Sequence, residues 1–293
     1  MDVKHTLTGN IQSHAQFESR ILRNRRDILV YLPPGYRRTL RRRYPVLYLN
    51  DGQNVFDAAT AFGGVEWGAD ETAQRLIGKR WIEPLIIVAV ANTGINRLHE
   101  YAPTAGVIDA NAKRKKRSHG WLRKYGRFLI EELKPFMDRQ YRTKPEAEFT
   151  GLGGSSLGGL AALVLGLWFP HVFSRVAVMS PSIWWDDGAI LRIVGLIEKK
   201  PSLKIWLDTG THEPGWEQAA VLRDRLVEAG WRLYDDLHYT EAEGADHSEG
   251  AWAARFEAVL RFLYPRLAAG VKGPPEPLQR RQIVVRGQAL AHT

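Results

Sequence analysis

The 293-residue sequence contains no cysteine. It therefore has no disulfide, no thiolate metal ligand and no cysteine nucleophile, and this composition fits a reducing compartment. No apolar run approaches the roughly 20 residues that span a bilayer. The opening segment, residues 1–5, lacks the apolar core of a signal peptide. From these absences we expect a cytoplasmic protein that has no membrane partner.

Positive charge is abundant, with a formal net charge of +9, which raises the possibility of a nucleic-acid partner. The basic residues cluster at 37–43, 113–117 and 279–281. Each cluster falls in an expected turn or loop, and none is interleaved with the aromatic residues that stack on bases. We therefore interpret the clusters as solvated loops and expect no nucleic-acid partner.

Strand-like and helix-like segments alternate along the chain, which is typical of an α/β sheet. Residues 44–50 and 84–91 are compact apolar runs of the kind buried inside a parallel sheet. Residues 20–22 and 27–32 predict an opening hairpin, and residues 121–139 carry apolar side chains at helical spacing. We predict an α/β-hydrolase fold with a mostly parallel central sheet flanked by helices on both faces.

Turn and composition signals also predict the domain organisation. No stretch before about residue 268 resembles an interdomain linker, so we predict one catalytic domain over residues 1–267. Residues 268–293 are rich in glycine and proline and predict a loosely structured C-terminal tail.

The motif Gly154-Ser155-Ser156-Leu157-Gly158 links an apolar strand to an apolar helix. A G-x-S-x-G turn in this context is typical of a nucleophile elbow, where glycines leave room for a strained serine. The first N–H groups of the following helix can then stabilise an oxyanion. We predict Ser156, at the apex of the turn, as the nucleophile.

A serine hydroxyl needs a base within hydrogen-bond reach and a third group to orient that base. In this fold the order along the chain is serine, acid, histidine. His238 lies in a predicted strand and His292 in the tail, which leaves His247, between the last strand and the final helix, as the base.

Two carboxylates follow the predicted strand 203–207, where the acid should lie. Asp208 stands at the strand end, and Glu213 stands on the loop that follows. We favour Glu213 because the loop gives it more reach toward His247, whereas Asp208 could brace the loop by accepting backbone N–H groups. Asp246 is a poor candidate, since neighbouring side chains point apart.

For the oxyanion hole, the expected donors are the N–H after the nucleophile and an N–H from the loop after strand 44–50. These are the backbone groups of Leu157 and Gln53. No metal site is expected, because Trp216 stands where an H-E-x-x-H motif starting at His212 needs its second histidine. No cofactor loop is expected either, because Ser156 replaces the third glycine of G-x-G-x-x-G.

Six ordered motifs together resemble the putative-esterase family of α/β-hydrolases. They are YLPPGY, YPVLYLNDGQNVFD, GSSLGGLAAL, SPSIWW, DTGTHE and GADHSEGAW, within residues 17–265. The family includes enterochelin-type siderophore esterases, feruloyl and acetyl-xylan esterases, S-formylglutathione hydrolase and mycolyl transferases. The resemblance implies Ser156 as nucleophile, His247 as base, Glu213 as acid and Gln53 as an oxyanion donor.

The substrate is expected to be a small-molecule ester. Trp184 and Trp185 follow a strand end and could stack on a ring, although one or both could simply pack under the rim. Their S-x-S-x-W-W setting resembles siderophore esterases, which act on catechol trilactones. Arg97 is a candidate carboxylate or carbonyl anchor, or could pair with Glu100 to hold its loop.

Two other functions are compatible with the same residues. An acyltransferase would form the same acyl-enzyme and deliver it to an alcohol. A binding protein with a basic surface on a hydrolase scaffold would show salt-sensitive binding to polyanions and no esterase activity. The sequence does not give the oligomeric state.

Overall fold

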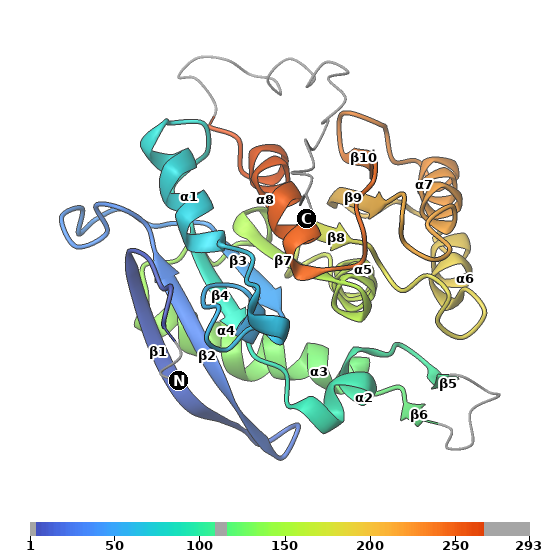
Figure 1. The fold of residues 1–293 in the computed structure, drawn as a ribbon, viewed down its shortest axis with the longest axis horizontal. Coiled ribbons are helices and arrows are strands. Elements are labelled where there is room, and N and C mark those ends of the chain that lie inside the picture. The colour runs from blue at the N-terminus through green and yellow to red at the C-terminus, as the bar shows by residue number, and fades with distance from the viewer. Residues whose placement is uncertain (1–3, 109–115, 267–293) are drawn as a thin grey trace, which may run out of the picture.

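A single eight-stranded sheet forms the centre of the computed structural model, which describes residues 4–108 and 116–266. The strand order is β1-β2-β4-β3-β7-β8-β9-β10 (Figure 1). The strands are β1 (Asn10–Ser19), β2 (Asn24–Leu32), β3 (Val46–Asn50), β4 (Ile86–Val90), β7 (Thr150–Ser155), β8 (Arg175–Met179), β9 (Lys204–Gly210) and β10 (Leu237–Ala242). All neighbours are parallel except β1 with β2 and β2 with β4, so the predicted mostly parallel sheet is confirmed.

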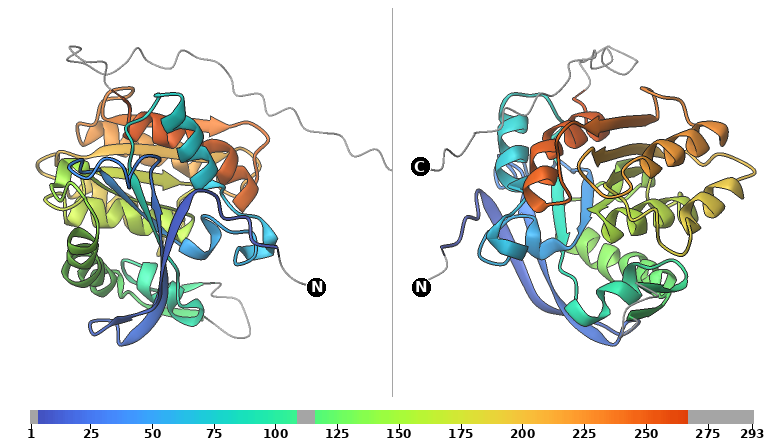
Figure 2. Two further views of the ribbon diagram at one scale, coloured as in Figure 1. Left: turned by 90° about the vertical axis from the view of Figure 1, so that its left-hand side faces the viewer. Right: turned by 45° about the vertical axis from the view of Figure 1, so that its right-hand side comes forward.

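Helices cover both faces of the sheet, as predicted (Figures 1 and 2). One face carries α1 (Ala69–Gly78) and α8 (Glu249–Leu263), which pack against each other. The other carries α3 (Leu122–Arg127), which continues through a π-helical turn (Phe128–Leu133) into α4 (Lys134–Gln140), together with α5 (Leu157–Trp168), α6 (Ala189–Gly195) and α7 (Gln218–Glu228). A separate hairpin of β5 (Ala105–Ile108) and β6 (Lys116–His119) follows the short helix α2 (Arg97–Tyr101).

Two hydrophobic cores lie on opposite faces of the sheet. In β3, Leu47 and Leu49 belong to the core under α1 and α8, whereas Tyr48 between them belongs to the core under α3, α4 and α5. This alternation follows from the two-residue period of a strand. Strands buried on both faces explain the uninterrupted apolar runs in the sequence.

The opening hairpin is present, but the prediction misplaced its first strand. β1 occupies Asn10–Ser19, and residues 20–23 form the turn. β1 is an edge strand with exposed and half-buried positions and a register shift between His14 and Phe17. A polar, irregular edge strand lacks the apolar pattern by which a strand is recognised in sequence.

The predicted tail, 268–293, lies outside the described residues, as does part of the basic cluster 113–117. Within residues 4–108 and 116–266, no helix is long and apolar enough to cross a bilayer. The carboxyl ends of the parallel strands β3, β7, β8, β9 and β10 meet at one edge of the sheet, and the loops at that edge carry the candidate site.

Candidate active site

Ser156 sits at a strained turn between β7 and α5. Its φ and ψ are 57° and −126°, a conformation that residues with side chains rarely adopt. A Cβ on Gly154 would lie 2.8 Å from the backbone of Gly158, and one on Gly158 would lie 3.1 Å from the Asp51 carboxylate. Gly154 is therefore required by close packing, and a side chain at Gly158 would force its neighbours to shift, in line with the motif.

Hydrogen bonds to the next strand hold the turn in place. The Ser156 N–H donates to the Met179 carbonyl (2.9 Å), and the Ser182 N–H donates to the Ser156 carbonyl (3.2 Å). The Ser156 hydroxyl lies 3.3 Å from the Ser182 hydroxyl. Within the described chain, no hydrogen bond joins the Ser156 hydroxyl to His247.

His247 and Glu213 are paired. His247 Nδ1 lies 2.8 Å from Glu213 Oε2, so Nδ1 carries the proton and Nε2 is left as the basic nitrogen. The other oxygen, Glu213 Oε1, accepts hydrogen bonds from the Ser180 hydroxyl (2.6 Å) and the Gly210 N–H (2.7 Å). The histidine side chain is 40% exposed and the glutamate 6%. The imidazole also packs edge-on against the Trp252 ring.

The surroundings of Glu213 keep it ionised. Burial alone would raise the pKa of this carboxyl, but hydrogen bonds from His247, Ser180 and Gly210 outweigh it and lower the pKa below its usual value. A carboxylate that stays charged can orient an imidazole and stabilise the imidazolium.

Asp208, the alternative acid, is fully buried, and none of its hydrogen bonds within the described residues involves His247. Its Oδ2 accepts from the Trp206 indole (2.7 Å), and its Oδ1 lies 3.2 Å from Arg255 Nη2. Its Oδ1 also accepts the Ser180 backbone N–H (3.3 Å). Asp208 thus braces the residue after β8, whereas the alternative considered for it was to brace the loop that carries Glu213.

Gln53 and Leu157, the predicted oxyanion donors, each stand in the first turn of a helix. Gln53 is in the first turn of a short 3₁₀ helix, η1 (Gly52–Asn54), and Leu157 is the first residue of α5. Neither N–H has an acceptor within its own helix, because the first donors of a helix point beyond its end. The Gln53 side chain accepts from the Asn92 N–H (3.2 Å), which fixes the loop.

Arg97 holds the η1 loop through Asp51. Its guanidinium forms two hydrogen bonds with the Asp51 carboxylate, at 2.7 and 2.8 Å. The alternative pairing with Glu100 is wrong, because Glu100 is buried against Arg26 (2.8 Å). The Arg97 side chain is 29% exposed, and a contact with substrate stays a prediction.

The tryptophan pair divides between surface and core. Trp184 is 48% exposed and lines a small cavity of about 40 Å³ with Glu213, His247 and Trp216. Trp185 is 1% exposed, and its indole N–H donates to Thr104 (3.2 Å). The structure therefore gives Trp185 a packing role under the rim in place of the predicted substrate contact, because β-hairpin and loop atoms cover its ring.

Three residues that support the site were not predicted. Ser180, directly after β8, accepts from Trp252 (2.9 Å) and Arg255 (2.8 Å) while donating to Glu213. Glu249, at the start of α8, accepts from Asn54 (2.7 Å) on the η1 loop. Ser180 and Glu249 stand inside the SPSIWW and GADHSEGAW motifs, which is the signal that could have identified them; Arg255 has none.

A mostly parallel sheet, a strained serine on the strand-to-helix turn and a histidine–carboxylate pair at the same edge define an α/β-hydrolase. The chain belongs to the "Putative esterase" family, which matches residues 19–263. It is therefore an ester hydrolase by fold and family.

Three similar proteins illustrate the family. The uncharacterized protein YbbA of Bacillus subtilis is 24% identical over 252 residues, covering 82% of this chain and 93% of its own. The ferri-bacillibactin esterase BesA of the same organism is 29% identical over 157 residues, and this chain spans about half its length. The solved structure of the BES protein from Bacillus cereus has a TM-score of 0.67 at 22% identity, covering 90% of this chain and 99% of that one.

Proposed function

We propose that the protein is a serine carboxylesterase with Ser156 as nucleophile, His247 as base and Glu213 as the acid that orients the base. The observation that carries the proposal is the 2.8 Å contact between His247 Nδ1 and Glu213 Oε2, at the edge of the sheet where Ser156 lies. This contact fixes the tautomer whose free Nε2 can accept a proton from a serine hydroxyl.

In the first half of the reaction, the Ser156 hydroxyl adds to the ester carbonyl while His247 takes its proton. The N–H groups of Gln53 and Leu157 stabilise the resulting oxyanion. The tetrahedral intermediate collapses, the C–O bond to the alcohol breaks, and His247 returns the proton to the departing alkoxide. An acyl group remains on Ser156.

In the second half, water replaces the alcohol. His247 takes a proton from water, the hydroxide adds to the acyl carbonyl, and the same two N–H groups stabilise the second oxyanion. Collapse releases the carboxylic acid and returns the proton to Ser156. The pKa of Glu213, lowered by its hydrogen bonds, keeps the carboxylate charged opposite the imidazolium in both halves.

Esters with an aromatic group, including siderophore trilactones, are the proposed substrate class. Relatives named ferri-bacillibactin esterase and iron(III) enterobactin esterase support this proposal. The chain spans about half of the first and a quarter of the second. The exposed Trp184 ring beside His247 offers a stacking surface for such a group.

The two adjacent serines of the elbow provide a matched test of the nucleophile. Ser156→Ala should lower kcat/KM for p-nitrophenyl acetate by about 10³-fold or more and abolish labelling by a fluorophosphonate probe. Ser155→Ala, the same change one residue away, should keep both. An active or labelled Ser156→Ala protein would overturn the assignment of Ser156.

The substrate class is tested by comparing a catechol trilactone, a feruloyl ester and p-nitrophenyl acetate. Trp184→Ala should raise KM for the two aromatic esters about tenfold, which corresponds to one lost stacking contact, and leave p-nitrophenyl acetate unchanged. Turnover of short esters alone would contradict the aromatic class while leaving the esterase assignment intact.

A further inference from the structure

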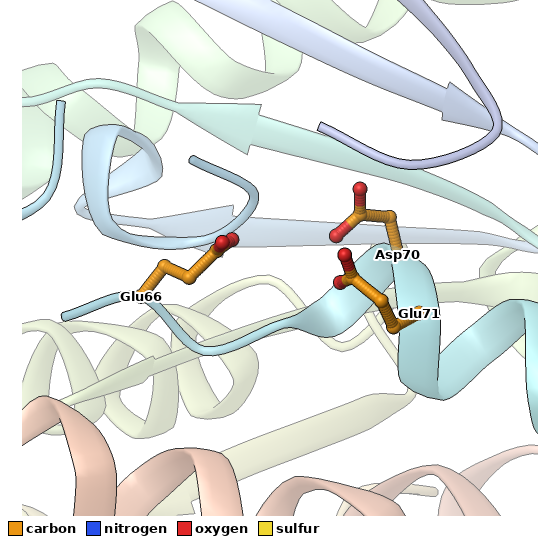
Figure 3. Close-up of side chains that lie close together, drawn as sticks. All are labelled: Glu66, Asp70 and Glu71. Carbon is orange, nitrogen blue, oxygen red and sulfur yellow. The ribbon is translucent and has the colours of Figure 1, made fainter. Parts of the chain in front are cut away.

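Three carboxylates converge at the start of α1, on the face of the sheet covered by α1 and α8. Glu66 precedes the helix, and Asp70 and Glu71 lie in its first turn. One oxygen from each lies within 4.8 Å of the other two, and Figure 3 shows the carboxylate groups pointing toward one another. We call these residues the acidic cluster.

The N-terminal segment donates a hydrogen bond to one oxygen of each carboxylate in the acidic cluster. The Thr6 hydroxyl donates to Glu66 Oε1, the Thr8 N–H donates to Asp70 Oδ2 (2.6 Å), and the Thr8 hydroxyl donates to Glu71 Oε1 (2.7 Å). The second oxygen of each is shielded from solvent and has no hydrogen-bond partner in the described chain: Glu66 Oε2, Asp70 Oδ1 and Glu71 Oε2.

No basic side chain within residues 4–108 and 116–266 forms an ion pair with the acidic cluster. The nearby Asp57 adds a further negative charge and is itself paired with His5 (2.6 Å). Without a cation, the cluster is therefore a costly arrangement of like charges.

The helix N-terminus explains only part of this arrangement. Acidic side chains are favoured in the first turn of a helix because its N–H groups carry partial positive charge. That effect accounts for Asp70 and Glu71 separately. It does not account for the convergence of Glu66 from outside the helix, nor for a fully buried Asp70 that has an unpartnered oxygen.

We propose that the acidic cluster binds a hard divalent cation of the Ca²⁺ type through Glu66 Oε2, Asp70 Oδ1 and Glu71 Oε2. Ca²⁺ takes carboxylate oxygens at about 2.3–2.6 Å and completes its shell with water, so oxygens this close to one another can all reach one ion. The ion would fasten residues 4–8 to α1, because the same carboxylates bind Thr6 and Thr8. This proposal is independent of the esterase mechanism.

Thermal unfolding of protein freed of metal with EDTA tests the site. Millimolar CaCl₂ should raise Tm by at least about 3 °C, since an ion that binds only the folded state stabilises it by mass action. Calorimetric titration with Ca²⁺ alone should show one site. MgCl₂ and MnCl₂ are run in parallel to rank the ions, with KCl at equal ionic strength as the salt control.

The effect of Glu71→Gln on stability should differ between EDTA and CaCl₂. In EDTA the variant should be more stable than wild type, because a repulsive charge is removed, and in CaCl₂ it should lose the stabilisation. Glu131→Gln, an exposed carboxylate paired with Arg127, should respond to Ca²⁺ as wild type does. If Glu71→Gln fails to fold, Glu66→Gln outside the helix makes the same comparison.

Three results would overturn the proposal. The first is a wild-type Tm and heat of titration that no divalent ion changes. The second is a Ca²⁺ response that is unchanged in the glutamine variants. The third is a Glu71→Gln protein that is less stable than wild type in EDTA. The last result would mean that the carboxylates share a proton and need no cation.

Discussion

Two regions of the molecule bury carboxylates in opposite ways. At the end of β9, Glu213 and Asp208 are surrounded by donors from Ser180, Trp206 and Arg255. At the start of α1, the acidic cluster has donors on one side only and leaves an oxygen of each carboxylate unpartnered. Both groups lie beside helices on the same face of the sheet, and Glu213 and Asp70 are both buried, so burial alone does not distinguish these two carboxylates.

The difference between Glu213 and Asp70 shows that enough donors outweigh burial and keep a carboxylate charged; at Asp208 burial raises the pKa in spite of its donors. Hydrogen bonds lower the pKa of Glu213 against the effect of burial, whereas burial raises the pKa of Asp70 to about 8. A charged, fully hydrogen-bonded carboxylate is suited to orient a histidine. A set of partly unpartnered carboxylates is suited to receive a cation.

The largest expected effect follows from removing the charge of Glu213. Glu213→Gln keeps the shape but replaces the acceptor of the His247 Nδ1–H with a group that can also donate. We expect kcat for p-nitrophenyl acetate to fall about 10²- to 10⁴-fold, because the wrong tautomer is favoured, with a much smaller change in KM. Steady-state kinetics of the purified variant measure this.

Asp246→Asn is the matched control for that variant. Asp246 is the neighbour of His247 and accepts from the Ser248 hydroxyl (2.5 Å), so its loss should change kcat less than about threefold. Equal losses in the two variants would mean that negative charge near His247 matters more than the hydrogen bond from Glu213.

An intermediate effect is expected from Arg255, the cation beneath the β9 carboxylates. Arg255→Met leaves Asp208 buried with no counter-charge and should lower the free energy of unfolding by about 3 kcal/mol. Denaturant melts at neutral pH measure the change. Arg75→Met, which removes a surface partner of Glu257, should cost less than about 1 kcal/mol. A similar loss in both would show that the buried ion pair contributes no more to stability than a surface pair does.

The smallest expected effect is a pH dependence of stability at Glu249. This residue accepts hydrogen bonds, as Glu213 does, and has a raised pKa, as Asp70 does. It accepts from Asn54 and Trp67, yet burial raises its pKa from 4.5 to about 6. The unfolded chain therefore ionises first as pH rises, so the contribution of this residue to stability falls between about pH 4.5 and 6 and stays lost above pH 6.

Glu249→Gln should remove that contribution. Relative to the variant, wild-type Tm should fall by about 2 °C between these pH values, as measured by calorimetry in buffers of equal ionic strength. Glu213 acts with the opposite sign, since its lowered pKa costs stability as pH falls. A Tm difference between wild type and variant that does not change with pH would show that Glu249 keeps an ordinary pKa.

Much of the fold could be predicted because its signals are local. The apolar runs 44–50 and 84–91 and the helical spacing over 121–139 depend on burial and periodicity, which the sequence displays directly. β1 could not be predicted from the sequence, because this edge strand is held by its pairing with β2 and lacks an apolar pattern of its own. β10 begins at Leu237, after a turn in which the Asp235 and Asp236 N–H groups donate to the Arg232 carbonyl.

The candidate site also contains some features that the sequence predicts and others that it does not. Ser156, His247 and Glu213 stand in ordered motifs, and the structure brings His247 and Glu213 together. Trp184 and Trp185 are identical neighbours in the sequence, yet one is half exposed and the other buried. Arg97 turned out to hold Asp51, a partner 46 residues away, and no local pattern specifies a pairing at that separation.

The sequence by itself determined the class of fold, the family and the residues proposed for catalysis, because strand ends and strained turns leave a local signature of glycine, serine and apolar runs. Only the tertiary structure decided which donors surround each buried carboxylate. Glu66, Asp70 and Glu71 show no metal-site spacing in the sequence, and the hydrogen bonds that Thr6 and Thr8 donate to them join segments about 60 residues apart. The pKa of a buried group depends on such contacts, which lie far apart along the chain.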